Sequence, residues 1–219
     1  PPMPPHANWY ERVLLPRLLD LACGTRPVRR QRAKVVPQAE GEVLEVGIGT
    51  GLNLPFYDRA RVRRIVGVDP ALQMHPLALR RVAATGISVE LVGLSAERLP
   101  LQDLSFDTVV CTYALCSIPD APAALAEVRR VLRPGGRLLF CEHGRAPDES
   151  VRRWQHRLQP LWGPLAGGCR LDVDVPALLT AAGFDAAVES RYLPGPRFAS
   201  YHYWGVATVA APGSGAATR

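Results

Sequence analysis

Three glycines at alternate positions follow a short apolar run in residues 43–58, VLEVGIGTGLNLPFYD. The run contains an acidic side chain, Glu45, and the glycines are Gly47, Gly49 and Gly51. Glycine adopts turn conformations that other residues avoid, and it lets a ligand approach the backbone closely. Three glycines so close to a carboxylate carry a conformational cost, so we interpret this turn as a ligand site rather than a simple connection.

Two familiar phosphate sites do not fit this turn. A dinucleotide site needs a small residue three positions after its second glycine, where the helix packs on the strand, and Leu52 is too large. A Walker loop needs a lysine and then a serine or threonine after its last glycine, where this chain has Leu52 and Asn53. The turn is therefore predicted to bring its backbone close to a ligand that lacks a diphosphate.

A second acidic residue, Asp69, ends the next apolar run, IVGVDP. A carboxylate at the tip of a second strand can accept two hydrogen bonds from the hydroxyl groups of a ribose. Taken alone, Asp69 could instead cap a helix that begins at Pro70. Together with the glycine turn, it predicts a nucleoside ligand with free ribose hydroxyls.

Hydrophobic periodicity indicates the elements that must position these residues. Short apolar runs without alternation are separated by helical stretches, which is typical of a parallel sheet covered by helices on both faces. The predicted strands are 43–46, 64–68, 87–92, 107–112, 137–143, 186–191 and 201–209. The predicted helices are an N-terminal segment, a segment after Gly51, 74–85, 96–99, 121–132 and 175–182. We therefore predict an α/β fold.

The motifs EVGIGTG, VDP and LRPGG together resemble class I S-adenosylmethionine-dependent methyltransferases over residues 35–143. The resemblance implies a Rossmann-like, seven-stranded, mostly parallel sheet in the order 3-2-1-4-5-7-6, with strand seven antiparallel. It also implies helical caps at the N-terminus and after strand five. We expect an N-terminal cap over 1–40, the methyltransferase domain over 41–211 with a substrate-capping insertion at about 145–175, and a flexible tail over 212–219.

The same resemblance implies contacts with S-adenosylmethionine. The glycine turn would lie beside the methionine portion, Glu45 would support the turn or the amino group, and Asp69 would hold the ribose. Pro70 and Met74 would lie against the adenine, and Ser95 stands where many relatives carry an aspartate that contacts the adenine amine. The expected cofactor-binding residues are Glu45, Gly47, Gly49, Gly51, Asn53, Asp69, Pro70, Met74, Ser95, Ala96, Glu97 and Thr112.

A second resemblance concerns the methyl acceptor. The segments CTYALCSIPD, FCEH, WQxxLxPxW and GGCxL are similar to ubiquinone-biosynthesis-like (methyltransferase type 11) enzymes, a subgroup that includes the animal methyltransferase-like alkyl thiol S-methyltransferases. The similarity implies methyl transfer to a small thiol or to sulfide by in-line displacement, leaving S-adenosylhomocysteine. Because only a thiolate attacks well, a base would help. The expected catalytic residues are His143, Tyr113 and His202, and the expected pocket residues are Cys116, Trp154, Trp162 and Tyr201.

Other interpretations of these residues stay open. His143 could hydrogen-bond Glu142 or a loop carbonyl, and the aromatic residues could simply pack the capping segments. The acceptor could be a phospholipid amine or a quinone ring, and the chain could bind S-adenosylmethionine without turnover. We expect no nucleic-acid substrate, because the sequence has no Asn/Asp-Pro-Pro-Tyr signature for a flipped base. We expect no metal, because the cysteines lack the spacing of a ligand set.

Charge and composition add few constraints. The net charge is +6 and the pI about 9.4, but 25 of the 26 basic residues are arginine, which indicates compositional bias more than a nucleic-acid surface. We interpret the basic cluster at 26–34 as a solvated helix face, with an anion-binding patch or a weak peripheral membrane contact as the alternative. No apolar run reaches the ~20 residues of a membrane span, and the N-terminus does not resemble a signal peptide. Five cysteines without paired spacing indicate free thiols in a reducing, cytoplasmic setting.

Overall fold

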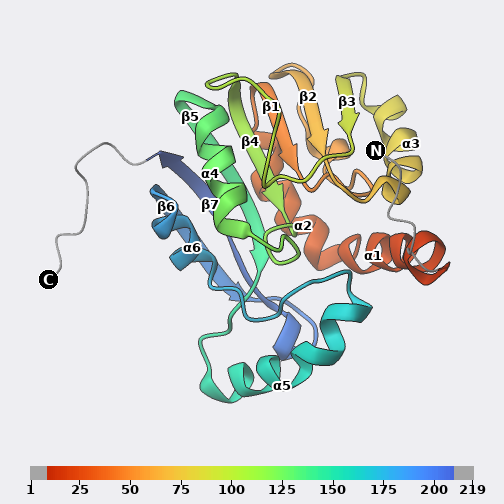
Figure 1. Ribbon diagram of the computed structural model, residues 1–219, viewed down its shortest axis with the longest axis vertical. Helices are drawn as coiled ribbons and strands as arrows, with labels where there is room; N and C mark the ends of the chain where they lie inside the picture. Colours follow the sequence, from red (N-terminus) through yellow and green to blue (C-terminus); the bar gives the residue numbers. More distant parts are fainter. Residues whose placement is uncertain (1–8, 210–219) are drawn as a thin grey trace, which may run out of the picture.

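Seven strands form one sheet in the computed structural model, which describes residues 9–209 (Figure 1). The strands are β1 (Gly41–Val46), β2 (Val62–Val68), β3 (Ser88–Val92), β4 (Phe106–Thr112), β5 (Leu132–His143), β6 (Phe184–Tyr192) and β7 (Tyr201–Val209). Their order is β3-β2-β1-β4-β5-β7-β6, and all neighbouring pairs are parallel except the two that β7 makes. This arrangement confirms the α/β fold class and the topology that the motifs implied.

Helices cover both faces of the sheet. They are α1 (Leu15–Cys23), α2 (Arg26–Val35), α3 (His75–Thr85), α4 (Ala121–Val131), α5 (Glu149–Leu165) and α6 (Val175–Ala181). One hydrophobic cluster lies under α4 and α6 and includes Leu125 and Leu179, and a second one, on the side of α2, includes Val35 and Ile65. By contrast, α5 lies beyond the carboxyl end of β5 rather than on a face of the sheet (Figure 1). It can therefore cover the end of the sheet where parallel strands present their functional loops.

Acidic caps set the starts of α4 and α6. The Asp120 carboxylate accepts a hydrogen bond from the Ala123 N at 3.0 Å, and the Asp174 carboxylate accepts one from the Ala177 N at 3.2 Å. Each cap satisfies a backbone N–H that has no partner inside the helix, and each helix has a proline in its first turn, where that residue is tolerated.

Two of the predicted helices are absent. The segment after Gly51 forms only a short 3-10 turn, Leu54–Phe56, because Pro55 lacks an N–H and the Asn53 side chain points back to Glu45. Residues 96–99 form a turn instead of a helix.

Three further features differ from the prediction. The helix predicted at 121–132 ends at Val131, and residues 132–136 belong to β5 because Leu132 already pairs with Phe106 of β4. In the capping segment, a 17-residue helix, α5, runs through Pro160 and Pro164. Prolines inside a helix break the usual sequence signal, which is why its limits were not predicted. The basic cluster at 26–34 forms a helix, α2, but it is not simply a solvated face.

Two residues of that basic cluster are buried. Gln31 and Arg32 are only 2% and 4% exposed. They share one face of α2 with Val28 and Val35, since residues three and four positions apart are neighbours on a helix. This face packs against β5 and β7, so the solvated-face interpretation was wrong for Gln31 and Arg32.

The predicted domain limits are not tested by these elements alone. The N-terminal helices α1 and α2 precede Gly41, where β1 begins, and α5 lies inside the expected insertion. The expected tail, 212–219, lies outside the described residues. Across residues 9–209, every helix is too short or too polar to cross a bilayer. The division into cap, domain and tail stays a prediction.

Candidate active site

The glycine turn after β1 packs so closely that two of its glycines have no room for a side chain. Gly47, Gly49 and Gly51 all have positive φ angles, of 70°, 52° and 80°. A Cβ atom at Gly47 would lie 2.4 Å from the Ala114 Cβ, and one at Gly51 would lie 2.8 Å from the Leu54 Cδ1. The turn is therefore pressed against the loop that follows β4, where Ala114 lies.

Asp69 follows β2 and is fastened to the glycine turn. Its Oδ2 accepts a hydrogen bond from the Gly49 N at 2.9 Å, and its Oδ1 accepts one from the Ala71 N at 2.8 Å. The residue is 9% exposed, and burial raises the pKa of its carboxyl group. Each carboxylate oxygen has a further lone pair, so Asp69 can still accept hydrogen bonds from a ribose.

Glu45 is buried beneath the turn and is fully engaged there. Its Oε1 accepts a hydrogen bond from the Asn53 Nδ2 at 2.9 Å, and its Oε2 accepts one from the Tyr57 hydroxyl at 2.7 Å. Burial raises the pKa of Glu45 to about 7. Of the two roles expected for Glu45, this geometry favours support of the turn over contact with a ligand.

Arg32, to which the sequence analysis assigned no functional role, connects the turn with the end of β4. Its Nη1 donates hydrogen bonds to the Asn53 Oδ1 at 2.6 Å and to the Thr112 Oγ1 at 2.5 Å. The guanidinium carbon lies 4.8 Å from the centre of the Tyr113 ring, a cation–π distance. The helical spacing between Arg32 and Val35 is the sequence signal that could have indicated its burial.

The residues expected to contact the adenine lie mostly in the turn after β3. The Ser95 hydroxyl donates to the Glu97 Oε2 at 2.8 Å, and the Asp120 N donates to the Glu97 Oε1 at 2.7 Å. Ala96 is buried, and Pro70 is exposed at the end of β2. These contacts hold the turn in shape, and the roles of its residues toward an adenine stay predictions.

The loop after β4 is held in place by Glu142 on β5. The Glu142 Oε1 accepts hydrogen bonds from the Ala114 N at 2.8 Å and the Leu115 N at 3.2 Å. Burial raises the pKa of Glu142 to about 7. Tyr113, at the start of this loop, has a φ of 55°, an unfavourable conformation for a residue other than glycine. The contacts with Glu142 therefore hold this loop, which also contains Cys116, in its conformation.

Cys116, His143 and Cys169 meet in a group that we call the Cys2His cluster. They come from the loop after β4, the end of β5 and the loop after α5. Their sulfur and ring-nitrogen atoms lie within 4.8 Å of one another. The His143 Nε2 is 3.0 Å from the Cys169 Sγ, which also accepts a hydrogen bond from the Trp162 Nε1 at 3.3 Å. Cys116, His143 and Trp162 were expected in the site from the sequence, whereas Cys169 had no predicted role.

Hydrogen bonding within the Cys2His cluster separates the acidities of its two thiols. The bond with the Cys116 thiol is the largest cause of a lowered pKa at Cys169, and His143 and Trp162 lower it further. The same bond raises the pKa of Cys116. Burial alone would lower the pKa of His143, but its hydrogen bond to Cys169 and the charge there raise it. Cys169 is therefore the thiol that ionises first, beside an imidazole that holds its proton more strongly.

Two glutamines of α5 hold the backbone around the cluster. Gln155, fully buried, donates through its Nε2 to the carbonyl oxygens of Gly144 at 2.9 Å and Leu171 at 2.8 Å. Gln159 donates through its Nε2 to the Cys169 carbonyl oxygen at 3.1 Å and accepts from the Leu171 N at 2.7 Å. Because both side chains bond to the backbone next to Cys169, α5 positions this residue against the end of β5.

The structure brings the three expected catalytic residues together. The His202 ring lies 5.6 Å from the Tyr113 ring and 6.3 Å from the His143 ring, measured between centroids. The His202 Nδ1 donates to the Ser200 carbonyl oxygen at 2.9 Å. Burial lowers the pKa of His202 to about 4 and raises that of Tyr113, so both are neutral near pH 7. His202 and Tyr113 are therefore better suited to lining the site than to exchanging protons.

Two expected pocket residues lie away from the cluster. Trp154 is 56% exposed, with the Arg157 guanidinium carbon 5.8 Å from the centre of its ring. Tyr201 packs edge-to-face with Tyr203, and alternation along β7 places both on the opposite face from His202. Trp154 on α5 and Tyr201 on β7 therefore lie in surroundings different from those of Trp162 and Cys116.

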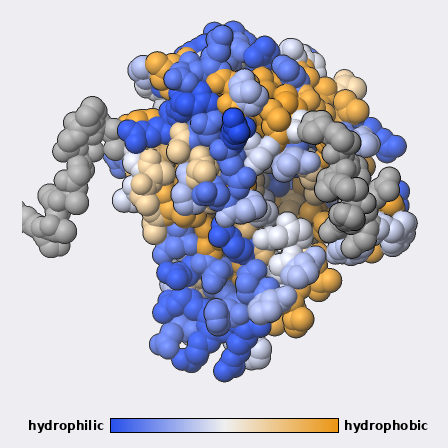
Figure 2. Space-filling view, viewed as in Figure 1, coloured by the Kyte–Doolittle hydropathy of each residue, from blue (hydrophilic) through white to orange (hydrophobic). Residues whose placement is uncertain are grey.

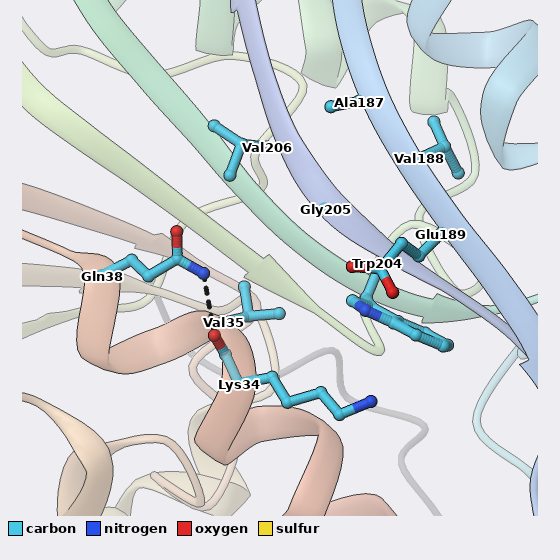
Figure 3. Close-up of a pocket in the computed structure, with 9 residues that line it drawn as sticks. All are labelled: Lys34, Val35, Gln38, Ala187, Val188, Glu189, Trp204, Gly205 and Val206. Atoms are coloured by element: carbon cyan, nitrogen blue, oxygen red, sulfur yellow. Dashed lines mark hydrogen bonds between the residues drawn. The ribbon is translucent and has the colours of Figure 1, made fainter.

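A concavity of about 590 Å³ lies elsewhere, between α2 and strands β6 and β7 (Figure 3). At its edge the Lys34 Nζ lies 4.2 Å from the centre of the Trp204 ring. The described residues that line it include none from the glycine turn and none from the Cys2His cluster. The glycine turn and the Cys2His cluster therefore lie apart from this concavity.

Known proteins similar to this chain are methyltransferases. A family model described as a methyltransferase domain matches residues 44–140. The chain is 37% identical to the thiol S-methyltransferase TMT1B of Rattus norvegicus over 136 residues, which cover 60% of this chain and 55% of that protein. It is 34% identical to the demethylmenaquinone methyltransferase of Thermus thermophilus over 160 residues, which cover 71% of this chain and 73% of that protein. The chain thus spans little more than half the length of the thiol methyltransferase.

Solved structures share the fold. The S-adenosylmethionine-dependent methyltransferase of Thermotoga maritima aligns with a TM-score of 0.65 at 24% sequence identity, covering 91% of this chain and 98% of that one. At this identity the likeness shows the fold alone.

Proposed function

Because the chain belongs to the family of S-adenosylmethionine-dependent methyltransferases, we propose that it transfers a methyl group from S-adenosylmethionine to a small thiol or to sulfide. When bound, the cofactor supplies a methyl group that is activated by a sulfonium and leaves as S-adenosylhomocysteine. The tasks of the chain are then to hold the cofactor, to align the acceptor and to exclude water. The free cysteines suit a reducing compartment such as the cytoplasm.

The residues at the glycine turn fit this cofactor. Gly47 and Gly51 are packed against protein, but a Cβ atom at Gly49 would find only the Met74 Sδ at 3.6 Å and the Asp69 Oδ2 at 3.8 Å as its nearest side-chain neighbours. The side chains nearest to Gly49 thus lie at van der Waals distance, and they belong to residues expected to contact adenine and ribose. Their proximity to the glycine turn supports Asp69 and Met74 as the nucleoside-binding pair.

One observation carries the choice of acceptor: the loop after β4 that packs on the glycine turn also brings Cys116 into the Cys2His cluster. A site lined by thiols, imidazole and the Trp162 indole is polarizable, which suits a small sulfur compound. The similarity to thiol S-methyltransferases supports the same choice.

We assign to His143 the role of the base that removes the proton from the thiol substrate. A free thiol has a pKa near ~8.5 and reacts as its thiolate, so a neighbouring base accelerates the attack at neutral pH. The Nε2 of His143 lies beside Cys169, and its Nδ1 has no hydrogen-bond partner among the described residues, so this second nitrogen is the one placed to take the proton. Tyr113 and His202 close the site around the acceptor, and Thr112 closes it toward the cofactor.

Headspace analysis tests the proposal. Purified protein is incubated with S-adenosylmethionine and either sulfide or a short alkyl thiol, and methyl thioether or methanethiol is measured together with S-adenosylhomocysteine. We expect one S-adenosylhomocysteine for each methyl group transferred, and a strong loss of both products with the Asp69→Ala variant at S-adenosylmethionine concentrations near the wild-type Kd. Tight binding of S-adenosylmethionine without any product from sulfide or thiols would contradict the thiol acceptor.

Methylation of a quinone ring is the second candidate, and two observations favour it. The similarity to the demethylmenaquinone methyltransferase covers more of both proteins than the similarity to the thiol enzyme does. Leu161 and Leu165 of α5 are 69% and 64% exposed, and Figure 2 shows hydrophobic surface at the end of α5 nearest α1. Such a surface could accept an apolar molecule.

The same assay separates the candidates when acceptors are exchanged. A demethylated menaquinone in detergent and vesicles of phosphatidylethanolamine are supplied in place of the thiol. Methyl incorporation into the quinone or the lipid amine, with none into sulfide, would replace the thiol acceptor by that compound.

A further inference from the structure

The Cys2His cluster combines the ligand types that zinc prefers. In a tetrahedral zinc site with bonds of about 2.3 Å to sulfur and about 2.0 Å to nitrogen, neighbouring ligand atoms lie roughly 3.5–3.8 Å apart. The ligand atoms of Cys116, His143 and Cys169 all lie within 4.8 Å of one another, and the His143 Nε2 is 3.0 Å from the Cys169 Sγ. These separations therefore differ by no more than about 1 Å from those in a zinc site.

We propose that Cys116, His143 and Cys169 bind a zinc ion, and that the fourth position of this ion takes the sulfur of the methyl acceptor. The second part rests on the proposed function, whereas the first part does not. Within residues 9–209, the group of ligand atoms contains these three residues and no fourth one. Three protein ligands and one open position are typical of catalytic zinc, while structural zinc has four protein ligands.

Each ligand sits on backbone that other contacts hold in place. The Cys116 carbonyl oxygen accepts a hydrogen bond from the Arg170 N at 2.8 Å, which joins the two cysteine loops directly. His143 ends β5 and is paired with His202 of β7. Gln159 holds the backbone at Cys169. A site that is formed before the metal arrives does not have to order its ligands on binding, which favours affinity.

The surroundings of the ligands also suit a metal. The Trp162 Nε1 donates to the Cys169 Sγ at 3.3 Å, an outer contact that orients a thiolate ligand. Cys116 and Cys169 are buried. Two zinc-bound thiolates reduce the net charge at the metal to zero, so the ion can be buried without a further counter-charge.

The zinc site changes how the acceptor is activated. A thiol that coordinates zinc loses its proton to solvent, because the metal stabilises the thiolate. The sulfur lone pair then forms the new bond to the methyl carbon while the bond from that carbon to the sulfonium sulfur breaks. The thioether product is a weak ligand and leaves the metal. In this state His143 is a zinc ligand, and the proton acceptor is water.

Zinc binding is measured first, without any acceptor. The full chain is reduced, stripped of metal and titrated with zinc against a chromophoric chelator, and bound zinc is counted after gel filtration. We expect one zinc per chain, and a loss of affinity of at least about 100-fold in Cys116→Ser and Cys169→Ser, a larger effect than the loss of an outer-shell partner. Cys23→Ser is the matched control, since Cys23 lies outside the cluster and is expected to keep the affinity of the wild type.

Cobalt provides a second readout. Cobalt in place of zinc should show sulfur-to-cobalt charge-transfer bands that disappear in the Cys169→Ser variant, and unfolding curves and S-adenosylmethionine affinity show whether that variant is folded. The absence of zinc from the reduced wild type, or equal binding by wild type and both cysteine variants, would overturn the site.

The zinc measurement and the activity assay test the metal site and the proposed thiol acceptor independently. Zinc that depends on Cys116 and Cys169, without turnover of sulfide or thiols, supports the metal site and rejects the acceptor. Full thiol methylation by the metal-stripped chain would retain the acceptor and overturn the role of zinc in activating it.

Discussion

The proposed cofactor end and the proposed acceptor end of the site are built in opposite ways. The proposed cofactor end consists of the glycine turn and Asp69, which follow the neighbouring strands β1 and β2, and hydrogen bonds join Gly49 to Asp69 and Asn53 to Glu45. The acceptor end, the Cys2His cluster, takes its residues from three segments far apart in the chain. The residues of the proposed cofactor end thus follow two adjacent strands, whereas the packing of α5 over the end of β5 completes the proposed acceptor end.

The two ends also differ in what their polar groups contact. At the cofactor end, backbone N–H groups and side-chain donors bind the carboxylates of Asp69 and Glu45. At the acceptor end, thiols and an imidazole contact mainly one another. Such an arrangement lets the acceptor change without changes in the cofactor site. Arg32, and the close contact of Gly47 with Ala114, are the points where the two ends meet.

Asp69→Ala should have the largest effect and should be confined to the cofactor end. Hydrogen bonds to a charged group contribute about 1.5–3 kcal/mol each, so loss of two ribose contacts should weaken S-adenosylmethionine binding by about 100-fold or more. Titration calorimetry measures the affinity. Zinc affinity should stay within about twofold if the two ends are independent. Asp69→Asn, which keeps the shape, should lose less. Unchanged cofactor affinity in Asp69→Ala would contradict the ribose assignment.

Arg32→Met should weaken the connection between the two ends. It removes the donor to Asn53 and Thr112, and it leaves Glu45 without its nearby buried positive charge. Breaking a buried charged contact costs about 3 kcal/mol, which urea unfolding should show. The matched control is Arg30→Met on the exposed side of α2, expected to stay within about 0.5 kcal/mol. Equal stability of the two variants would show that Arg32 does not connect the ends.

The pH dependence of stability should reveal one buried carboxyl group at each end. Burial raises the pKa of Glu45 and of Glu142 from 4.5 to about 7. Between these values the folded state holds more protons than the unfolded state, so the free energy of unfolding falls as pH rises, by up to about 3 kcal/mol per group. Below pH 4.5 both states are protonated and this difference disappears.

Glu45→Gln and Glu142→Gln should each flatten that decline. Urea unfolding at about pH 5 and about pH 8 measures it, and the wild type should lose more stability than either variant over this interval. An equal decline in the wild type and in both variants would show that other groups cause the pH dependence.

The smallest predicted effect is a difference in reaction rate between variants of Trp162 and Trp154, the two tryptophans of α5. Trp162→Phe removes the donor to the Cys169 Sγ and should lower the rate with thiols about three- to tenfold, since one such hydrogen bond contributes about 1 kcal/mol. S-adenosylmethionine affinity should not change. Trp154→Phe, on the solvent side of the same helix, should keep the wild-type rate within about twofold. Rates that change equally in both variants would indicate a general effect on α5.

Local patterns predicted most of the strands and part of the site. The strand expected at 201–209 is β7 with the same limits, and the one expected at 107–112 is β4 with one residue more. Strands are recognisable here because apolar runs are separated by helical periodicity. The absent helices, after Gly51 and at 96–99, were short segments, where periodicity is too brief to separate a helix from a turn.

The acceptor end could be predicted only in part. His143, Cys116 and Trp162 were named from motifs, but their meeting with Cys169 depends on how α5 packs over the end of β5. That packing rests on Gln155 and Gln159, whose bonds reach backbone groups between 9 and 43 residues away in the chain. Spacing along the chain carries no sign of such contacts, which is why a metal was not expected.

Glycine conformation and the placing of Asp69 after an apolar strand are local properties, so the cofactor motif and the fold class could be read from the chain alone. The burial of Arg32 and the meeting of two thiols with an imidazole are not local. Both depend on which helix packs against which strand in the assembled sheet. This packing joins segments that are far apart in the sequence.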